Sequence, residues 1–95
     1  MPAYVIAMVD VKDPGGYERY RKLVLPTITA YGGHFIARGG QTEVLEGPWQ
    51  PRRVVIVEFP TLARAKEWWN SPEYSEARAI RQATSQGTLI VTEGI

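Results

Sequence analysis

The chain has 95 residues and a formal net charge of +1 at pH 7, with 11 Lys or Arg against 10 Asp or Glu. A chain of this length supplies the core of one domain, so we expect residues 1–95 to fold as a single unit. The near balance of charge argues against a nucleic acid or an anionic membrane as the partner. The sequence contains no cysteine and one histidine, which excludes disulfides, iron–sulfur clusters and multi-histidine metal sites within one chain. Neither a metal nor an organic cofactor is indicated.

The hydrophobic pattern is that of a globular protein and not of a membrane protein. Hydrophobic residues make up 44% of the chain, and no apolar run approaches the ~20 residues of a membrane span. The first residues lead directly into a β-branched run, without the layout of a signal peptide. We therefore expect a cytoplasmic protein.

The first half of the sequence predicts a strand, a helix and a second strand. Residues 3–11 are apolar and alternate, which predicts a strand. Asp13-Pro14 is a helix start, and the helix is expected to run to Tyr31, with Pro26 kinking or splitting it and Gly32-Gly33 ending it. A strand then begins near residue 33 or 34 and reaches Arg38. We expect Gly39-Gly40 to form a bulge, after which residues 42–46 continue the strand.

The second half predicts a strand, two helical segments and a last strand. Residues 47–50 with Pro51 predict a turn, and residues 52–59 a strand. A helix opens at Thr61, with Trp69 on its inward stripe and Trp68 beside it. Ser71-Pro72 restarts a helix over residues 73–86, Gly87 ends it, and residues 88–93 form a strand. This order predicts an α+β fold, the ferredoxin-like βαββαβ arrangement, in which an antiparallel sheet carries helices on one face.

Several motifs, in chain order, resemble the family called domain of unknown function 1330. They are Tyr4-Val5-Ile6-Ala7, Asp13-Pro14, Gly32-Gly33, Arg38-Gly39-Gly40, Leu45-Glu46-Gly47, Glu58-Phe59, Ser71-Pro72-Glu73-Tyr74 and Arg81-Gln82. The resemblance implies a dimeric α/β-barrel, in which two ferredoxin-like sheets face each other. That superfamily includes cofactor-independent monooxygenases, muconolactone isomerases, heme-degrading enzymes and ligand-sensing domains.

Alternation places a polar set on the sheet face that the helices leave bare. His34 and Arg38 share a face of one strand, and Glu58 belongs to the neighbouring strand, so Arg38 and Glu58 are expected to meet. In a catalytic interpretation, Arg38 binds a substrate anion or enolate while His34 or Glu58 moves a proton. In a structural interpretation, the same charges form an ion pair that fixes a dimer. The candidate binding residues are Tyr4, Asp10, Trp49 and Trp69.

Two functions from different classes therefore remain open. The first is a cofactor-independent monooxygenase or isomerase acting on a small hydrophobic carbonyl or phenolic metabolite. The second is a non-catalytic ligand-binding or structural dimer. In both, the expected partner is a second copy of the chain, bound through the bare sheet face, and a small molecule is the other candidate ligand.

Overall fold

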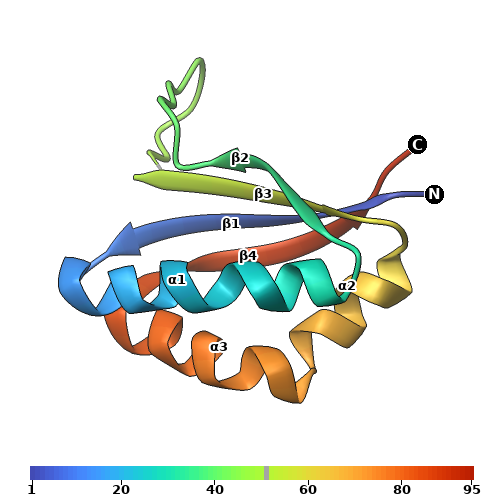
Figure 1. Cartoon of the computed structure of the whole chain (residues 1–95). Helices are drawn as coiled ribbons and strands as arrows, with labels where there is room; N and C mark the ends of the chain where they lie inside the picture. Colours follow the sequence, from blue (N-terminus) through green and yellow to red (C-terminus); the bar gives the residue numbers. More distant parts are fainter. Residues whose placement is uncertain (51) are drawn as a thin grey trace.

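The computed structural model describes residues 1–50 and 52–95, and within them it contains four strands and three helices (Figure 1). In chain order these elements are β1 (Ala3–Val11), α1 (Pro14–Ala30), β2 (His34–Arg38), β3 (Arg53–Phe59), α2 (Leu62–Trp69), α3 (Pro72–Thr84) and β4 (Ser85–Glu93). The strands form one antiparallel sheet in the order β2-β3-β1-β4. All three helices cover the same face of the sheet (Figure 1). The predicted ferredoxin-like α+β fold is confirmed.

The two central strands have the predicted alternation. On β1, Val5 and Val9 are buried under the helices, whereas Tyr4 and Met8 face the other side. That other side of the sheet, which the helices do not cover, is called the open face below. Residues of β3 follow the same rule, because Val57 is buried while its neighbours in sequence are half-buried. The sheet therefore has an apolar face under the helices and a second, open face, and the candidate site residues are divided between these two faces.

Helix α1 begins as predicted but is not split. The Asp13 side chain accepts a hydrogen bond from the Gly16 backbone nitrogen, and Pro14 occupies the first turn, where its missing N–H costs nothing. The helix continues through Pro26 to Ala30, because buried residues on both sides of the proline anchor it to the core. At its end Gly32 has a φ of 79°, which glycine adopts without steric cost.

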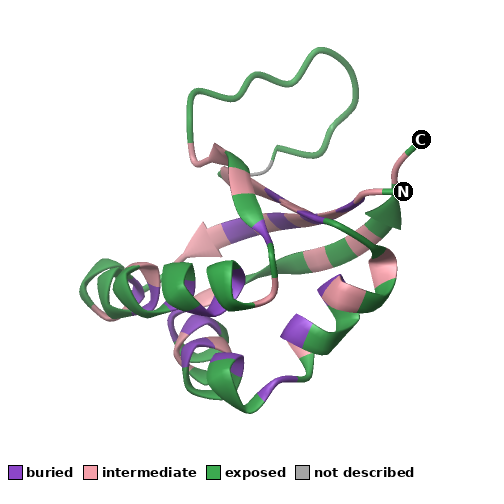
Figure 2. Ribbon diagram, turned by 45° about the vertical axis from the view of Figure 1, so that its right-hand side comes forward, coloured by how far each residue is buried: buried purple, intermediate pink, exposed green. Residues whose placement is uncertain are grey.

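Strand β2 differs most from the prediction. Phe35 pairs with Val57 but Ala37 pairs with Ile56, so a bulge places Ile36 as an extra residue. The bulge thus lies within β2 and not at Gly39-Gly40. The strand ends at Arg38, and residues 42–46 form no strand. The exposed loop over residues 39–50 leaves the sheet at this point (Figure 2).

The last helix ends earlier than predicted and β4 starts earlier. Ser85 is already extended, and its hydroxyl donates a hydrogen bond to the Arg81 carbonyl oxygen at 2.6 Å. Gly87 pairs with Val9 inside the strand and does not end a helix. A Cβ at Gly87 would collide with the Met8 carbonyl oxygen, so this glycine permits close approach of two backbones.

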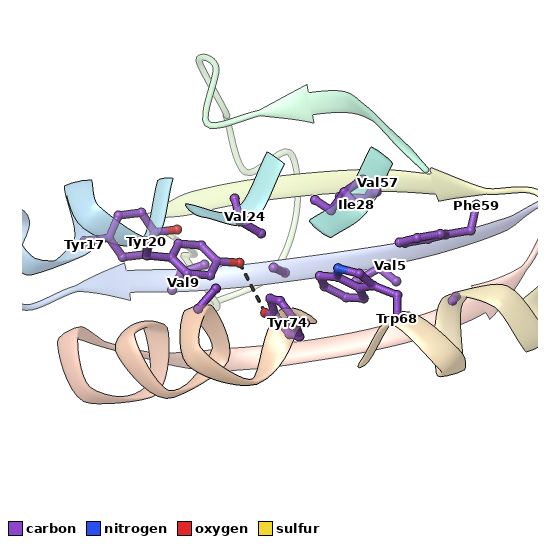
Figure 3. Packing of buried hydrophobic residues seen from close by; sticks show 13 residues of the cluster. Val5, Val9, Tyr17, Tyr20, Val24, Ile28, Val57, Phe59, Trp68 and Tyr74 are labelled. Carbon is purple, nitrogen blue, oxygen red and sulfur yellow. Dashed lines mark hydrogen bonds between the residues drawn. The ribbon is translucent and has the colours of Figure 1, made fainter. Parts of the chain in front are cut away.

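The core lies between the helices and the sheet and is rich in aromatic side chains (Figure 3). Trp68 is 2% exposed, and its ring centroid lies 4.0 Å from that of Tyr74 and 5.4 Å from that of Phe59. Its indole Nε1 donates to the Thr27 hydroxyl at 3.1 Å, so its polar atom is satisfied. The sequence predicted that Trp69 points inward and that Trp68 lies beside it. The two roles are exchanged, because Trp68 is the core residue and Trp69 is half-buried.

Candidate functional site

A polar row crosses the open face near one end of the sheet. His34 on β2 pairs with Glu58 on β3, which in turn pairs with Tyr4 on β1. His34 Nε2 lies 3.1 Å from a carboxylate oxygen of Glu58. The hydrogen bond of Tyr4 to Glu58, with burial and the carboxylate charge, raises the pKa of the Tyr4 phenol. The predicted candidates His34, Glu58 and Tyr4 are therefore brought together.

The next rows of the open face are apolar. Ile56, Ile6 and Ile90 are cross-strand neighbours, and Met8 lies opposite Val54. Ile90 remains 45% exposed. A contiguous apolar strip of this kind beside a polar row is typical of an interface.

Asp10 and Trp49 lie at the far end of the same face. The Lys12 ammonium, 2.7 Å from the Asp10 carboxylate, lowers the pKa of that carboxyl. Asp10, Trp49, Met8 and Thr88 contribute to a shallow pocket of about 240 Å³. The loop tryptophan is 59% exposed. The two candidates thus share a pocket, separated from His34 and Glu58 by the apolar strip.

Arg38 is not part of the open-face group. Because of the bulge, it pairs with Val55, whose side chain faces the helices. Its Nη2 donates to the Arg21 carbonyl oxygen at 2.9 Å, and its guanidinium lies 4.1 Å from the centroid of the Phe35 ring. The predicted contact between Arg38 and Glu58 is therefore wrong, as is the prediction that His34 and Arg38 share a face.

On the helix side, Arg38 lies beside three arginines that are not among the candidate site residues predicted from the sequence. Arg21, Arg53 and Arg81 line the same small cavity. Two of them occupy positions that periodicity assigns to the core side: Arg53 alternates in phase with Val57, and Arg81 follows Ala77 by one helical turn. A basic residue in such a position is a signal that a charge-bearing site faces inward.

Trp69 contributes to a different hollow, an apolar groove between α2 and β4. The groove has a volume of about 600 Å³ and is lined by Val5, Ala65, Lys66, Trp68, Trp69, Asn70, Leu89, Ile90 and Val91. Lys66 and Asn70 supply its polar side chains, and the Asn70 amide donates to the Lys66 carbonyl oxygen at 3.0 Å. Its size and apolar lining are those of a small-molecule pocket.

Residues 1–50 and 52–95 contain neither a metal-binding cluster nor a membrane-spanning helix. No group of three His, Asp or Glu side chains comes close enough there to hold a metal ion. Within the same ranges, the helices are too short or too polar to cross a bilayer.

Solved structures with this fold include proteins with and without a stated activity. A protein of unknown function from Rhodopseudomonas palustris superposes with a TM-score of 0.81 at 25% identity, covering 99% of this chain and 82% of the other. SnoaB, a cofactor-independent oxygenase from Streptomyces nogalater, has a TM-score of 0.67 at 9% identity, covering 99% and 93%. A dimeric ferredoxin-like protein of unknown function from Jannaschia sp. CCS1 has a TM-score of 0.67 at 11% identity, covering 99% and 100%.

No curated protein matches the sequence significantly. One family model does, and it matches residues 2–95, nearly the whole chain. The fold, the coverage and the motifs agree, and the chain belongs to the family described as domain of unknown function (DUF1330).

Proposed function

We propose that this protein binds a small hydrophobic carbonyl or phenolic compound in the groove between α2 and β4 and converts it without an organic cofactor, as a monooxygenase or an isomerase. The groove itself carries the proposal. It combines a volume of about 600 Å³ with Trp69, Leu89 and Val91 in its wall, which suits a flat apolar molecule. The shared fold with a cofactor-independent oxygenase is consistent with this chemistry.

Both reactions begin with the same step, the loss of a proton beside a carbonyl group or from a phenol. An isomerase returns the proton at another carbon. A monooxygenase lets the carbanion react with O2, so that a methylene becomes a carbonyl and the second oxygen atom leaves as water with the two methylene hydrogens. Lys66 and Asn70 are polar residues among those that line the groove, and we assign to them the stabilisation of the oxyanion.

The lining of the groove limits the substrate. Within the described residues it contains no carboxylate and no imidazole, because His34 and Glu58 lie on the open face. Water must therefore accept the proton, and the substrate must be acidic enough to release it near neutral pH. The same observation favours the second candidate function, a non-catalytic dimer that binds such a compound and releases it unchanged.

The assembly that we propose is a homodimer formed through the open face. Ile6, Ile56 and Ile90 present an apolar strip there, and burying such a strip against a second copy is favourable at roughly 25 cal/mol per Å². The polar row would then lie at the edge of the interface, where the His34–Glu58 pair fixes the register.

Binding and turnover can be tested with 2-tetralone, a hydrophobic ketone with an acidic methylene. We expect the tryptophan fluorescence to be quenched with saturation, and the methylene hydrogens to exchange with D2O faster than in buffer. Lys66→Met should bind the ketone but lower the exchange rate about 10- to 1000-fold. Lys22→Met, on an exposed turn of α1, is the matched control.

The outcomes separate the two candidates. Saturable quenching with accelerated exchange supports an enzyme, and O2 consumption then distinguishes the oxygenase from the isomerase. Saturable quenching with exchange at the buffer rate supports the non-catalytic binder. The proposed ligand site is contradicted if 2-tetralone does not quench the fluorescence. It is also contradicted if quenching is unchanged in Leu89→Trp, in which the larger side chain fills the groove.

A further inference from the structure

The small cavity on the helix side of the sheet is lined by four guanidinium groups that come from four different elements. Arg21 belongs to α1, Arg38 to β2, Arg53 to β3 and Arg81 to α3. These four residues are called the arginine cluster below. The cavity has a volume of about 20 Å³, enough for one water-sized group, such as a single oxygen atom of a bound anion. This cavity shares no lining residue with the groove between α2 and β4.

Aromatic rings, a carbonyl oxygen and a phenol hold the guanidiniums of Arg38, Arg53 and Arg81, and no acidic side chain of the described residues pairs with these three. Arg38 is fixed by the Arg21 carbonyl oxygen and the Phe35 ring. The guanidinium of Arg53 lies 5.6 Å from the centroid of the Tyr17 ring. Arg81 is 8% exposed, and its Nε donates to the Tyr74 hydroxyl at 3.3 Å. Such contacts orient a guanidinium but do not neutralise it.

A hydrogen-bonded chain of side chains extends from the cluster into the core. The Tyr74 hydroxyl lies 3.3 Å from that of Tyr20 (Figure 3). Burial raises the pKa of Tyr20 far above its ordinary value, so this phenol stays neutral and provides no counter-charge. The tyrosines around the cavity can donate a hydrogen bond to an anion but cannot balance four positive charges.

The charge of the cluster is compensated only in part. Over residues 1–50 and 52–95, Glu18 is the one acidic side chain within 4 Å of any of the four guanidiniums, and it contacts Arg21 at 3.3 Å on the exposed side. Burial, followed by the charges of Arg21 and Arg53, lowers the pKa of Arg38. Arg81 is buried and Arg38 and Arg53 are half-buried, and like charges removed from water without a partner are costly.

Two donors in the cluster also have no acceptor. The Nε–H groups of Arg21 and Arg53 are buried and make no hydrogen bond to any described residue. Buried donors in native proteins nearly always have a partner. Their lack of a protein partner, beside the two other cationic side chains Arg38 and Arg81, favours an anionic acceptor in this cavity.

We propose that the arginine cluster is a binding site for a small oxyanion, the carboxylate or phosphate head of a metabolite, which accepts hydrogen bonds from Arg21 Nε and Arg53 Nε. Planar guanidiniums match the spacing of two oxygens of such groups. The small volume admits one oxygen atom of the head group, so the remainder of the anion and of the molecule lies at the mouth of the cavity. This inference does not depend on the groove or on any turnover there.

The direct test is NMR of arginine Nε–H groups in the full chain, titrated with inorganic phosphate and separately with acetate. At constant ionic strength, we expect the Arg21 and Arg53 signals to move with saturation while that of Arg19, an exposed residue of the same helix, does not. A response to both probes assigns a general oxyanion site. A response to only one of them identifies the head group as phosphate or carboxylate.

A pair of variants tests the role of the guanidinium fork. Arg53→Met should weaken phosphate or acetate binding about tenfold or more, Arg53→Lys should restore only part of it, and Arg19→Met should leave it unchanged. If Arg53→Met fails to fold, the titration of the unaltered chain still decides the question. Signals that do not move, that move linearly like that of Arg19, or that respond equally to sodium chloride would overturn the proposal.

Discussion

Tyr4 and Glu58 lie directly opposite each other on the two central strands of the sheet, β1 and β3. Their hydrogen bond favours the neutral phenol, and with burial and the carboxylate charge it raises the pKa of Tyr4 above its ordinary value of 10.0. A folded-state pKa that is raised above the unfolded value adds stability below pH 10, and this contribution is lost as the pH rises through the folded pKa. We therefore expect Tyr4 to titrate above pH 10.0.

The test is a comparison of the unaltered chain with Glu58→Gln. In the variant, the pKa of Tyr4 should fall back toward 10.0, as measured from the ¹³Cζ shift of the tyrosine. His34→Gln is the control, because it keeps the Glu58 carboxylate beside Tyr4. An unchanged Tyr4 titration in Glu58→Gln would show that Glu58 does not govern this phenol.

Trp68 and Trp69 are consecutive in sequence but should differ sharply in their contribution to stability. Trp68 packs against Phe59 and Tyr74 in the core, whereas Trp69 is half-buried at the groove. Trp68→Ala should lower the free energy of unfolding by about 3–5 kcal/mol, as measured by urea denaturation. Trp69→Ala should cost less than half as much and should weaken ligand quenching. Equal losses would contradict the burial that the structure shows.

The proposed dimer can be tested with two exposed residues of nearly equal accessibility. Ile90 on the open face is 45% exposed and Leu25 on α1 is 46% exposed. Ile90→Glu should place a charge in the interface and raise the dimer dissociation constant at least tenfold, as measured by sedimentation velocity. Leu25→Glu should have no effect. If both variants dissociate alike, or neither does, the interface lies elsewhere.

The fold and one half of the candidate site could be predicted from the sequence, and the physical reason is periodicity. Alternation on β1 and β3 correctly placed Tyr4 and Glu58 on the open face, where they join His34. The same rule predicted the wrong face for Arg38, because the extra residue at Ile36 inverts the alternation along β2. The local sequence contains no pattern that predicts this bulge. Tertiary packing also decided between Trp68 and Trp69, since adjacent helical positions differ by only 100° around the axis.

Gly39 and Gly40 follow β2 in sequence, yet only the first should be intolerant of a side chain. Gly39 has a φ of 71°, and a Cβ on it would collide with the Arg53 guanidinium, whereas nothing lies within 4 Å of a Cβ on Gly40. Gly39→Ala should therefore cost about 1–2 kcal/mol of stability from the left-handed backbone, measured by denaturation, and Gly40→Ala close to nothing. The displaced Arg53 should also bind phosphate more weakly in Gly39→Ala. The backbone strain and the displacement of Arg53 are separate consequences of this substitution. A Gly39→Ala variant that is destabilised but binds phosphate as before would therefore show that Gly39 is needed for the backbone turn and not for the position of Arg53.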